Sequence, residues 1–197
     1  MDHVFHRLLE ASPPGRPAIV AVDGRSASGK STLAARLAAR HRAATVVHTD
    51  DVAWYRSFFD WDRELAGHVL EPVRQGLAVR YRPAAWDDRA RDGAIEVPAG
   101  IELVLVEGVG SSRGSLAPLL DTAVWVQSDD VRARTRGLAR DGGDPDAVAF
   151  WDAWDREERP FLERDRPWTR ARLVAWGTPS RPHDPAREVF VVAGPLG

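Results

Sequence analysis

One glycine-rich segment constrains the fold of this chain more than any other feature. Residues 24–31 read Gly-Arg-Ser-Ala-Ser-Gly-Lys-Ser, and they lie between an apolar run at 18–22 and a segment with leucines at helical spacing. Successive backbone N–H groups of such a turn, together with the N-terminus of the following helix, form a concavity of positive partial charge that fits a polyphosphate. The pattern G-x-x-x-x-G-K-[ST] therefore predicts a strand, a phosphate-binding loop and a helix in succession.

The residues of this loop have distinct expected roles. Lys30 is the single lysine among 27 basic residues, and we expect its compact ammonium to reach the outer phosphates, where a planar guanidinium would serve less well. The hydroxyl of Ser31 is expected on Mg²⁺. The expected cofactors are ATP and Mg²⁺, and the predicted cofactor-binding residues are Gly24, Ser26, Ala27, Ser28, Gly29, Lys30, Ser31 and Thr32.

The rest of the chain repeats the alternation of apolar runs and helical stretches. Predicted strands lie at 18–22, 45–48, 103–106, 123–126 and 173–176, with an edge strand at 189–192, and predicted helices lie at 2–11, 30–41, 62–76, 129–140 and 145–164. This alternation predicts an α/β three-layer sandwich, with a parallel sheet of about five strands and helices on both faces. We expect a single domain over residues 1–197, in which residues 83–98 form a long functional loop.

Composition excludes several classes of protein. The chain has 44% apolar and 28% charged residues and no cysteine, which excludes a disordered chain and a disulfide scaffold. A net charge of -2 gives no general attraction to nucleic acid or to anionic membranes. Residues 1–10 contain no long apolar run, so we expect neither a secretory signal nor a membrane anchor. These observations favour a cytoplasmic protein and make nucleic acid and membranes poor candidate partners.

Carboxylates follow two of the predicted strands. Asp50 and Asp51 come after the second strand, and Glu107 closes the run at 103–106. Strand ends of this kind face the ligand in open parallel sheets. Asp50 is our prediction for the base that takes the proton of an acceptor hydroxyl, with Asp51 as its substitute and helix capping as the alternative. Ser31, Asp50 and Glu107 are the predicted Mg²⁺ ligands, and the alternative for Glu107 is a solvated strand end.

Aromatic residues concentrate on the same side of the predicted loop. They are Trp54, Tyr55, Phe58, Phe59, Trp61 and Trp86. Their flat faces suit a base or another planar group, and packing in the core is the alternative use of such side chains.

A regular arginine spacing follows a predicted helix start at 128–130. Arg132, Arg136 and Arg140 recur every four residues and so share one helix face, and a glycine-containing turn comes after them. This pattern predicts a closing lid over about 132–150 that brings arginine to a transferring phosphate. A solvated helix face is the alternative. Residues 151–166 carry many charges of both signs and are predicted to form a surface helix with ion pairs and no chemistry.

Taken in this order, the motifs resemble the uridine kinase family of P-loop kinases, which is akin to pantothenate kinase and phosphoribulokinase. The similarity extends over about residues 18–178. It rests on Val22-Asp23-Gly24 and the loop after it, Thr49-Asp50-Asp51, Phe59-Asp60-Trp61, Leu70-Glu71-Pro72, Val106-Glu107-Gly108 and the arginines at 132–140.

The resemblance implies a phosphotransferase with an alcohol acceptor, most simply the 5′-hydroxyl of a nucleoside such as uridine or cytidine. Asp50 matches the carboxylate that accepts the hydroxyl proton, Asp60 the aspartate that holds the ribose hydroxyls, and Tyr81 an aromatic near the base. Arg136 and Arg140 match catalytic lid arginines. We add Asp51, Tyr55 and Trp86 as predicted substrate-binding residues. The family pattern also has a histidine that reads the pyrimidine, and residues 83–89 contain none.

Other functions stay open at this point. One is a kinase of another metabolite alcohol or of a nucleoside monophosphate, which would need an arginine clamp for the acceptor phosphate. The candidate clamp residues are Arg56, Arg80, Arg82 and Arg89. Another is a non-catalytic ATP-binding module, against which the intact set of phosphate-loop and carboxylate residues argues. The resemblance also raises homo-oligomer formation as a hypothesis.

Overall fold

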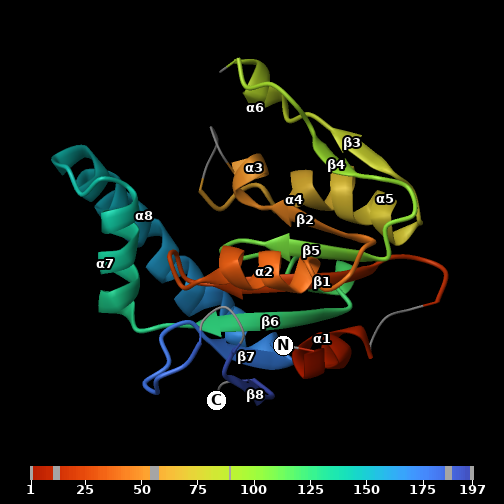
Figure 1. The fold of residues 1–197 in the computed structure, drawn as a ribbon. Helices are drawn as coiled ribbons and strands as arrows, with labels where there is room; N and C mark the ends of the chain where they lie inside the picture. Colours follow the sequence, from red (N-terminus) through yellow and green to blue (C-terminus); the bar gives the residue numbers. More distant parts are fainter. Residues whose placement is uncertain (1, 11–13, 54–57, 89, 185–187, 196–197) are drawn as a thin grey trace.

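The computed structural model describes residues 2–10, 14–53, 58–88, 90–184 and 188–195. Its centre is a six-stranded sheet in the order β2-β5-β1-β6-β7-β8 (Figure 1). The strands are β1 (Ala18–Gly24), β2 (Ala44–His48), β5 (Leu103–Glu107), β6 (Thr122–Gln127), β7 (Leu173–Trp176) and β8 (Val191–Ala193). Neighbours from β2 to β7 run parallel, and β8 pairs antiparallel with β7 at the edge. The predicted parallel strands and the edge strand are confirmed.

Helices cover both faces of this sheet because successive residues of a strand point to opposite sides. On one face Val20 packs with residues of α1 (Asp2–Leu9) and α2 (Lys30–Ala38). On the other face Ile19 packs with a helical rod. The rod consists of α4 (Asp62–Leu65), a π-helical segment (Ala66–Leu70) and α5 (Glu71–Arg74). All seven residues of β1 are buried, as expected of a central strand. The three-layer α/β sandwich is therefore confirmed.

The prediction of one long loop at 83–98 was wrong. This segment contains α6 (Ala84–Asp87) and β4 (Ile95–Val97), and β4 pairs antiparallel with β3 (Val79–Tyr81). The ribbon forms because Val79, Ile95 and Val97 turn inward and are buried against the helical rod. Each strand has only three residues, which is too short for alternation to stand out in the sequence.

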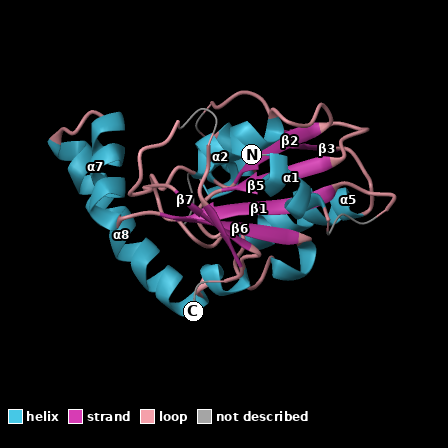
Figure 2. Cartoon of the chain, turned by 60° about the horizontal axis from the view of Figure 1, so that its bottom comes forward, coloured by secondary structure: helices cyan, strands magenta, loops and turns pink. Residues whose placement is uncertain are grey.

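Two long helices project from the end of the sheet at which the parallel strands finish (Figures 1 and 2). They are α7 (Asp130–Arg140) and α8 (Pro145–Asp165). Asp129 and Asp144 cap them by accepting hydrogen bonds from the backbone N–H groups of Arg132 and Ala147. A Cβ at Gly137 would overlap the Trp151 ring, so the two helices approach closely at this glycine.

The second half of α8 has an exposed face with the predicted kind of ion pair, Arg159 with Asp155 at 3.0 Å, and a second face that packs on the sheet, which was not predicted. Phe161 and Leu162 pack against Trp125 and Val174 of the sheet. Glu158 lies on the same side of the helix and is 3% exposed. The helix therefore joins the projecting helix pair to the core, because its first half projects and one face of its second half is buried.

The remaining described elements are short. They are α3 (Asp50–Ala53) and the 3₁₀ turns Ala117–Leu119 and Pro167–Arg170. None of the described helices has both the length and the apolarity needed to cross a bilayer.

Candidate active site

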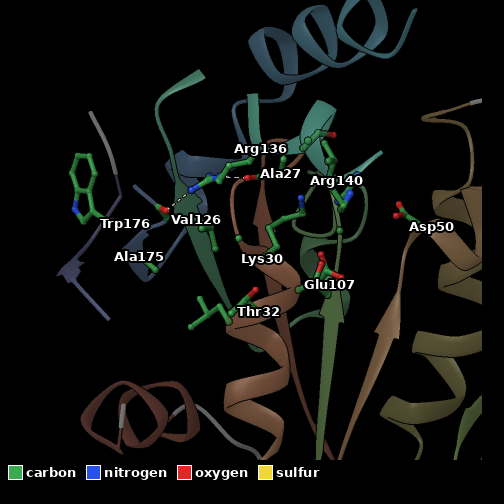
Figure 3. A pocket seen from close by; sticks show the side chains of 18 of the residues that line it. Ala27, Lys30, Thr32, Asp50, Glu107, Val126, Arg136, Arg140, Ala175 and Trp176 are labelled. Atoms are coloured by element: carbon green, nitrogen blue, oxygen red, sulfur yellow. Dashed lines mark hydrogen bonds between the residues drawn. The ribbon is translucent and has the colours of Figure 1, made fainter. Parts of the chain in front are cut away.

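A cavity of about 960 Å³ lies at the carboxyl edge of the parallel strands. The phosphate loop, the start of α2, the ends of several strands and the two projecting helices line it. Figure 3 shows Lys30 near its middle, with Glu107 and Asp50 to one side and Val126, Ala175 and Trp176 to the other. This volume is in the range of small-molecule sites, and the position is the one at which open parallel sheets bind ligands.

The phosphate loop has the expected conformation. Gly24 has φ 151° and an added Cβ would lie 2.6 Å from the Val126 carbonyl oxygen, so the loop can pass the next strand only with glycine here. Gly29 has φ 102° and immediately precedes α2, whose first residue is Lys30. The Lys30 Nζ donates a hydrogen bond to the Arg25 carbonyl oxygen at 2.9 Å. The lysine therefore curls over its own loop.

Most of the predicted cofactor-binding residues face the cavity. Those that line it are Ser26, Ala27, Gly29, Lys30, Ser31 and Thr32. Gly24 and Ser28 are not in its lining, and Ser28 is fully buried beneath the loop.

The two predicted strand-end carboxylates meet in the same cavity. Glu107 is the last residue of β5, and Asp50 begins α3 two residues after β2. The Thr49 N–H donates to the Glu107 carbonyl oxygen at 2.8 Å, which joins the two strand ends. A Cβ at Gly108 would overlap the Thr49 hydroxyl, so only glycine lets these ends approach so closely. Asp50, Glu107 and Lys30 all line the cavity.

Their surroundings give the two carboxylates opposite pKa shifts. Burial alone would raise the pKa of Glu107, but the hydrogen bond from His48, the charge of Lys30 and a hydrogen bond from Ser31 outweigh it and leave that pKa lowered. His48 Nδ1 lies 2.7 Å from Glu107 Oε2. Burial raises the pKa of Asp50, and the negative charge of Glu107 adds to this effect against the opposing charge of Lys30. Glu107 is thus held ionised, while Asp50 has increased affinity for a proton.

The donor set at this point fits magnesium by its chemistry. The Ser31 hydroxyl and the Glu107 and Asp50 carboxylates offer oxygen atoms of the kind that Mg²⁺ prefers. Mg²⁺ in such enzymes is held by one or two carboxylates together with substrate phosphates. The described part of the chain contains no cluster of three or more histidine, cysteine, aspartate or glutamate side chains that could hold a metal.

The lid arginines reach the cavity from α7. Arg136 donates from Nη2 to the Ala27 carbonyl oxygen at 2.8 Å and from Nη1 to that of Gly177 at 3.0 Å, so it spans the phosphate loop and the end of β7 (Figure 3). Arg140 also lines the cavity and is paired with Asp141 at 2.7 Å. Arg132, one turn earlier, is exposed and is not in the lining.

A connection between lid and phosphate loop was missed in the sequence. The Ser26 N–H donates to Glu158 Oε1 at 2.7 Å, and Arg25 pairs with Asp155 of α8 at 3.0 Å and with Asp130 of α7. Arg25 Nε also lies 3.5 Å from Glu158 Oε2. The signal available in the sequence was the spacing of Glu158 with the aromatic and apolar residues at 151, 154, 161 and 162, which places this carboxylate on the apolar face of the helix.

The residues predicted to bind the acceptor do not all lie at the cavity, unlike most of those predicted for the cofactor. Tyr81 donates from its hydroxyl to Glu64 Oε1 at 2.6 Å, and its ring stacks on His68 with centroids 4.2 Å apart. Trp86 is 3% exposed and donates from Nε1 to the Asp51 carbonyl oxygen at 2.7 Å. Neither ring lines the cavity.

Three further predicted residues also lie away from it or cannot be placed. The Asp51 carboxylate pairs with Arg91 at 2.5 Å. Asp60 is exposed and does not line the cavity. Tyr55 falls outside the described residues. The Phe and Trp residues that line the cavity are Phe58, which was predicted, and Phe150, Trp151, Trp154, Trp176 and Phe190, which were not.

Two of the solved structures with similar folds are kinases by their descriptions. A candidate fructose transport system kinase from Silicibacter sp. TM1040 superimposes with a TM-score of 0.57, at 24% identity, over 75% of this chain and 85% of that one. A possible uridine kinase from Bacillus stearothermophilus gives 0.56, at 22% identity, over 88% and 95%. The chain has a P-loop kinase fold.

The curated relatives differ from one another in function. The chain is 30% identical over 191 residues to a tRNA dimethylallyltransferase of Methylobacterium radiotolerans, covering 91% of this chain and 55% of that protein. It is 31% identical over 137 residues to a cytidylate kinase of Neisseria meningitidis, covering 68% and 60%. The chain thus spans somewhat more than half of the length of these relatives. No protein-family model matches the sequence. The comparisons support a nucleotide-binding fold of the kinase type.

Proposed function

We propose that the protein is an ATP- and Mg²⁺-dependent kinase that transfers the γ-phosphoryl group to a hydroxyl of a small molecule, with the 5′-hydroxyl of a nucleoside as the first candidate. One observation carries this proposal. A single cavity contains a phosphate loop with its lysine and, beside it, a carboxylate whose pKa is raised by burial. A phosphate donor and a proton acceptor in one enclosure are the two requirements of phosphoryl transfer to an alcohol.

In the proposed transfer, each of the cavity residues has a separate role. The oxygen of the acceptor hydroxyl forms a bond to the γ-phosphorus while the bond from that phosphorus to the bridging oxygen of ADP breaks, and the hydroxyl proton passes to the Asp50 carboxylate. Lys30 and Arg136 would exchange their loop carbonyl partners for the phosphate oxygens on which negative charge develops. Magnesium, when bound, neutralises part of the phosphate charge, and Ser31 and Glu107 would hold it.

A nucleoside monophosphate is the second candidate acceptor, because one of the curated relatives is a cytidylate kinase. Such an acceptor needs arginines for its own phosphate. Arg80 pairs with Glu96 on the ribbon and Arg82 with Asp87 of α6, and neither arginine lines the cavity. Arg56 and Arg89 lie outside the described residues. The contacts of the described candidates therefore favour an acceptor without a phosphate.

The decisive experiment measures ADP release by the purified protein with ATP and Mg²⁺ against nucleosides, nucleoside monophosphates, pantothenate and sugars. We expect one class of acceptor to give turnover that Lys30→Ala and Asp50→Asn both abolish. Calorimetric titration with ATP is done in parallel. ATP binding with no turnover on any acceptor would contradict the kinase proposal and favour a nucleotide-binding module.

A further inference from the structure

Aromatic side chains from two segments far apart in the sequence form one wall of the cavity. Phe58 and Trp154 have ring centroids 4.9 Å apart, and Phe150 meets Phe58 edge-on at 6.1 Å. The Phe150 and Trp154 rings are 6.5 Å apart with 28° between their planes. All three line the same cavity as Asp50. We call these three residues the aromatic wall.

The wall is incompletely covered by the protein itself. Phe150 is 54% exposed, although it stands in a helix whose neighbouring surface is rich in charge. The indole N–H of Trp154 is buried, and the described residues supply no acceptor for it. A partly exposed flat apolar surface is suited to packing against a planar ring.

The other aromatics predicted for this role are already occupied. One face of Tyr81 is covered by His68, and its hydroxyl is bonded to Glu64. The guanidinium of Arg91 lies 3.8 Å from the Trp86 ring centroid, and the Trp86 N–H is bonded within the fold. Tyr81 and Trp86 therefore provide no planar surface in the cavity, whereas the wall does.

We propose that the acceptor is an alcohol bearing a planar aromatic ring, and that this ring packs on the wall formed by Phe58, Phe150 and Trp154 while its hydroxyl lies at Asp50. The proposal rests on the kinase function proposed above and adds the residues that select the acceptor. Two of the three belong to α8, so the lid helix itself selects the acceptor. The same helix carries Glu158, which contacts the phosphate loop, and acceptor recognition is thus built on the element that also supports the donor site.

The test compares acceptors that share a hydroxyl but differ in the ring. Uridine and adenosine are compared with methyl β-D-ribofuranoside, which has the same 5′-hydroxyl without a base. Phe150→Ala is the main variant, and Val148→Ala is its matched control, because Val148 is 36% exposed on the same helix and does not line the cavity. Phe150→Leu keeps apolar bulk without a flat face, and Phe150→Trp restores a flat face.

We expect Phe150→Ala to raise KM for the ring-bearing acceptor about tenfold, with KM for ATP unchanged. Phe150→Leu should resemble Phe150→Ala, Phe150→Trp should restore the affinity, and Val148→Ala should behave as wild type. The furanoside should be a poor acceptor of every variant alike. An unchanged acceptor KM in Phe150→Ala, or equal use of furanoside and nucleosides, would overturn the proposal.

Binding measurements separate this proposal from the kinase function. Uridine and adenosine are titrated calorimetrically into wild type and Phe150→Ala in the presence of a non-hydrolysable ATP analogue. Affinity for a nucleoside that falls about tenfold in the variant, without turnover, would support the wall and contradict the kinase. Wild-type protein that binds neither nucleoside, or a variant that binds as tightly as wild type, would overturn the wall whatever the turnover assay shows.

Discussion

The two halves of the cavity are built in different ways. The donor half is one continuous loop, residues 24–32, whose backbone is held between β1, β6 and α2. The acceptor half is assembled from side chains of α3, residue 58 and the lid helix α8. Backbone groups in a fixed loop bind any polyphosphate, whereas side chains on separate elements can be exchanged one at a time. Substitutions in the donor half should therefore abolish transfer, and those in the acceptor half should change which molecule is used.

Lys30→Met tests the donor half at its centre and has the largest expected effect. The variant keeps most of the length of the side chain and removes the charge that would stabilise the transferring phosphate. We expect kcat to fall by about 10³-fold or more, with an unchanged circular dichroism spectrum. Steady-state ADP release is the measurement. A loss below about tenfold would mean that the loop backbone and the lid arginines carry the donor half without the lysine.

Glu158→Ala tests whether the two halves are separable at all. The substitution leaves the Ser26 N–H without its acceptor and Arg25 without one of its carboxylates. We expect KM for ATP to rise about 10- to 100-fold, because hydrogen bonds to charged groups contribute about 1.5–3 kcal/mol.

Glu158→Gln is the conservative control for this experiment. Its amide oxygen can still accept from Ser26, so it should retain part of the ATP affinity. If KM for ATP is unaltered in both variants while acceptor KM changes, α8 belongs to the acceptor half alone.

Asp23→Asn tests the support that both halves share. Asp23 is fully buried and accepts hydrogen bonds from the N–H groups of Gly24, Gly110 and Ser112 and from the Ser112 hydroxyl, which joins the phosphate loop to the segment after β5. In the asparagine variant an amide nitrogen replaces one carboxylate oxygen and cannot accept the hydrogen bonds that this oxygen accepted. We expect the free energy of unfolding to fall by about 1–3 kcal/mol.

The loss of unfolding free energy caused by Asp23→Asn should become smaller as pH rises. Burial raises the pKa of Asp23 above 3.8, so across the interval between that value and the folded pKa the folded state holds more protons than the unfolded state. Wild type therefore loses stability as pH rises through this interval, and the asparagine variant lacks that contribution. Urea unfolding at several pH values should show a cost that shrinks as pH rises. A cost that grows with pH would mean that the hydrogen bonds outweigh burial.

Tyr81→Phe has the smallest expected effect and tests whether the β3–β4 ribbon belongs to the acceptor half. The variant keeps the ring stacked on His68 and removes the hydrogen bond to Glu64. We expect about 0.5–1.5 kcal/mol less stability in thermal unfolding and no change in acceptor KM. A rise in acceptor KM would place the β3–β4 ribbon in substrate recognition and weaken the case for the aromatic wall.

The donor half of the site could be predicted from the sequence better than the acceptor half. The loop at 24–31, Asp50 and Glu107 could be placed because parallel strands bring their carboxyl ends to one edge, so local pattern and strand order suffice. Phe150 and Trp154 could not be assigned to the cavity. The spacing could place Glu158 on the apolar face of its helix but not against the phosphate loop, because what packs against that face is decided by the tertiary fold.

In the fold, the same limit applied to the short strands of the ribbon. The long buried runs of β1 and β5 were recognised from apolar continuity alone. The three-residue strands β3 and β4 exist only through their pairing with each other, which is a tertiary event that no local window contains.

The position of Lys30 has a practical consequence for chemical labelling. All other basic side chains of Lys and Arg type are guanidiniums, so an amine-acylating reagent encounters one side-chain amine, which is 7% exposed and lies in the cavity. The fraction of protein acylated at this position would report directly on occupancy of the donor half. Protection by a nucleotide could then be followed by intact-protein mass spectrometry, with the α-amino group as the internal reference and without a radioactive or fluorescent ligand.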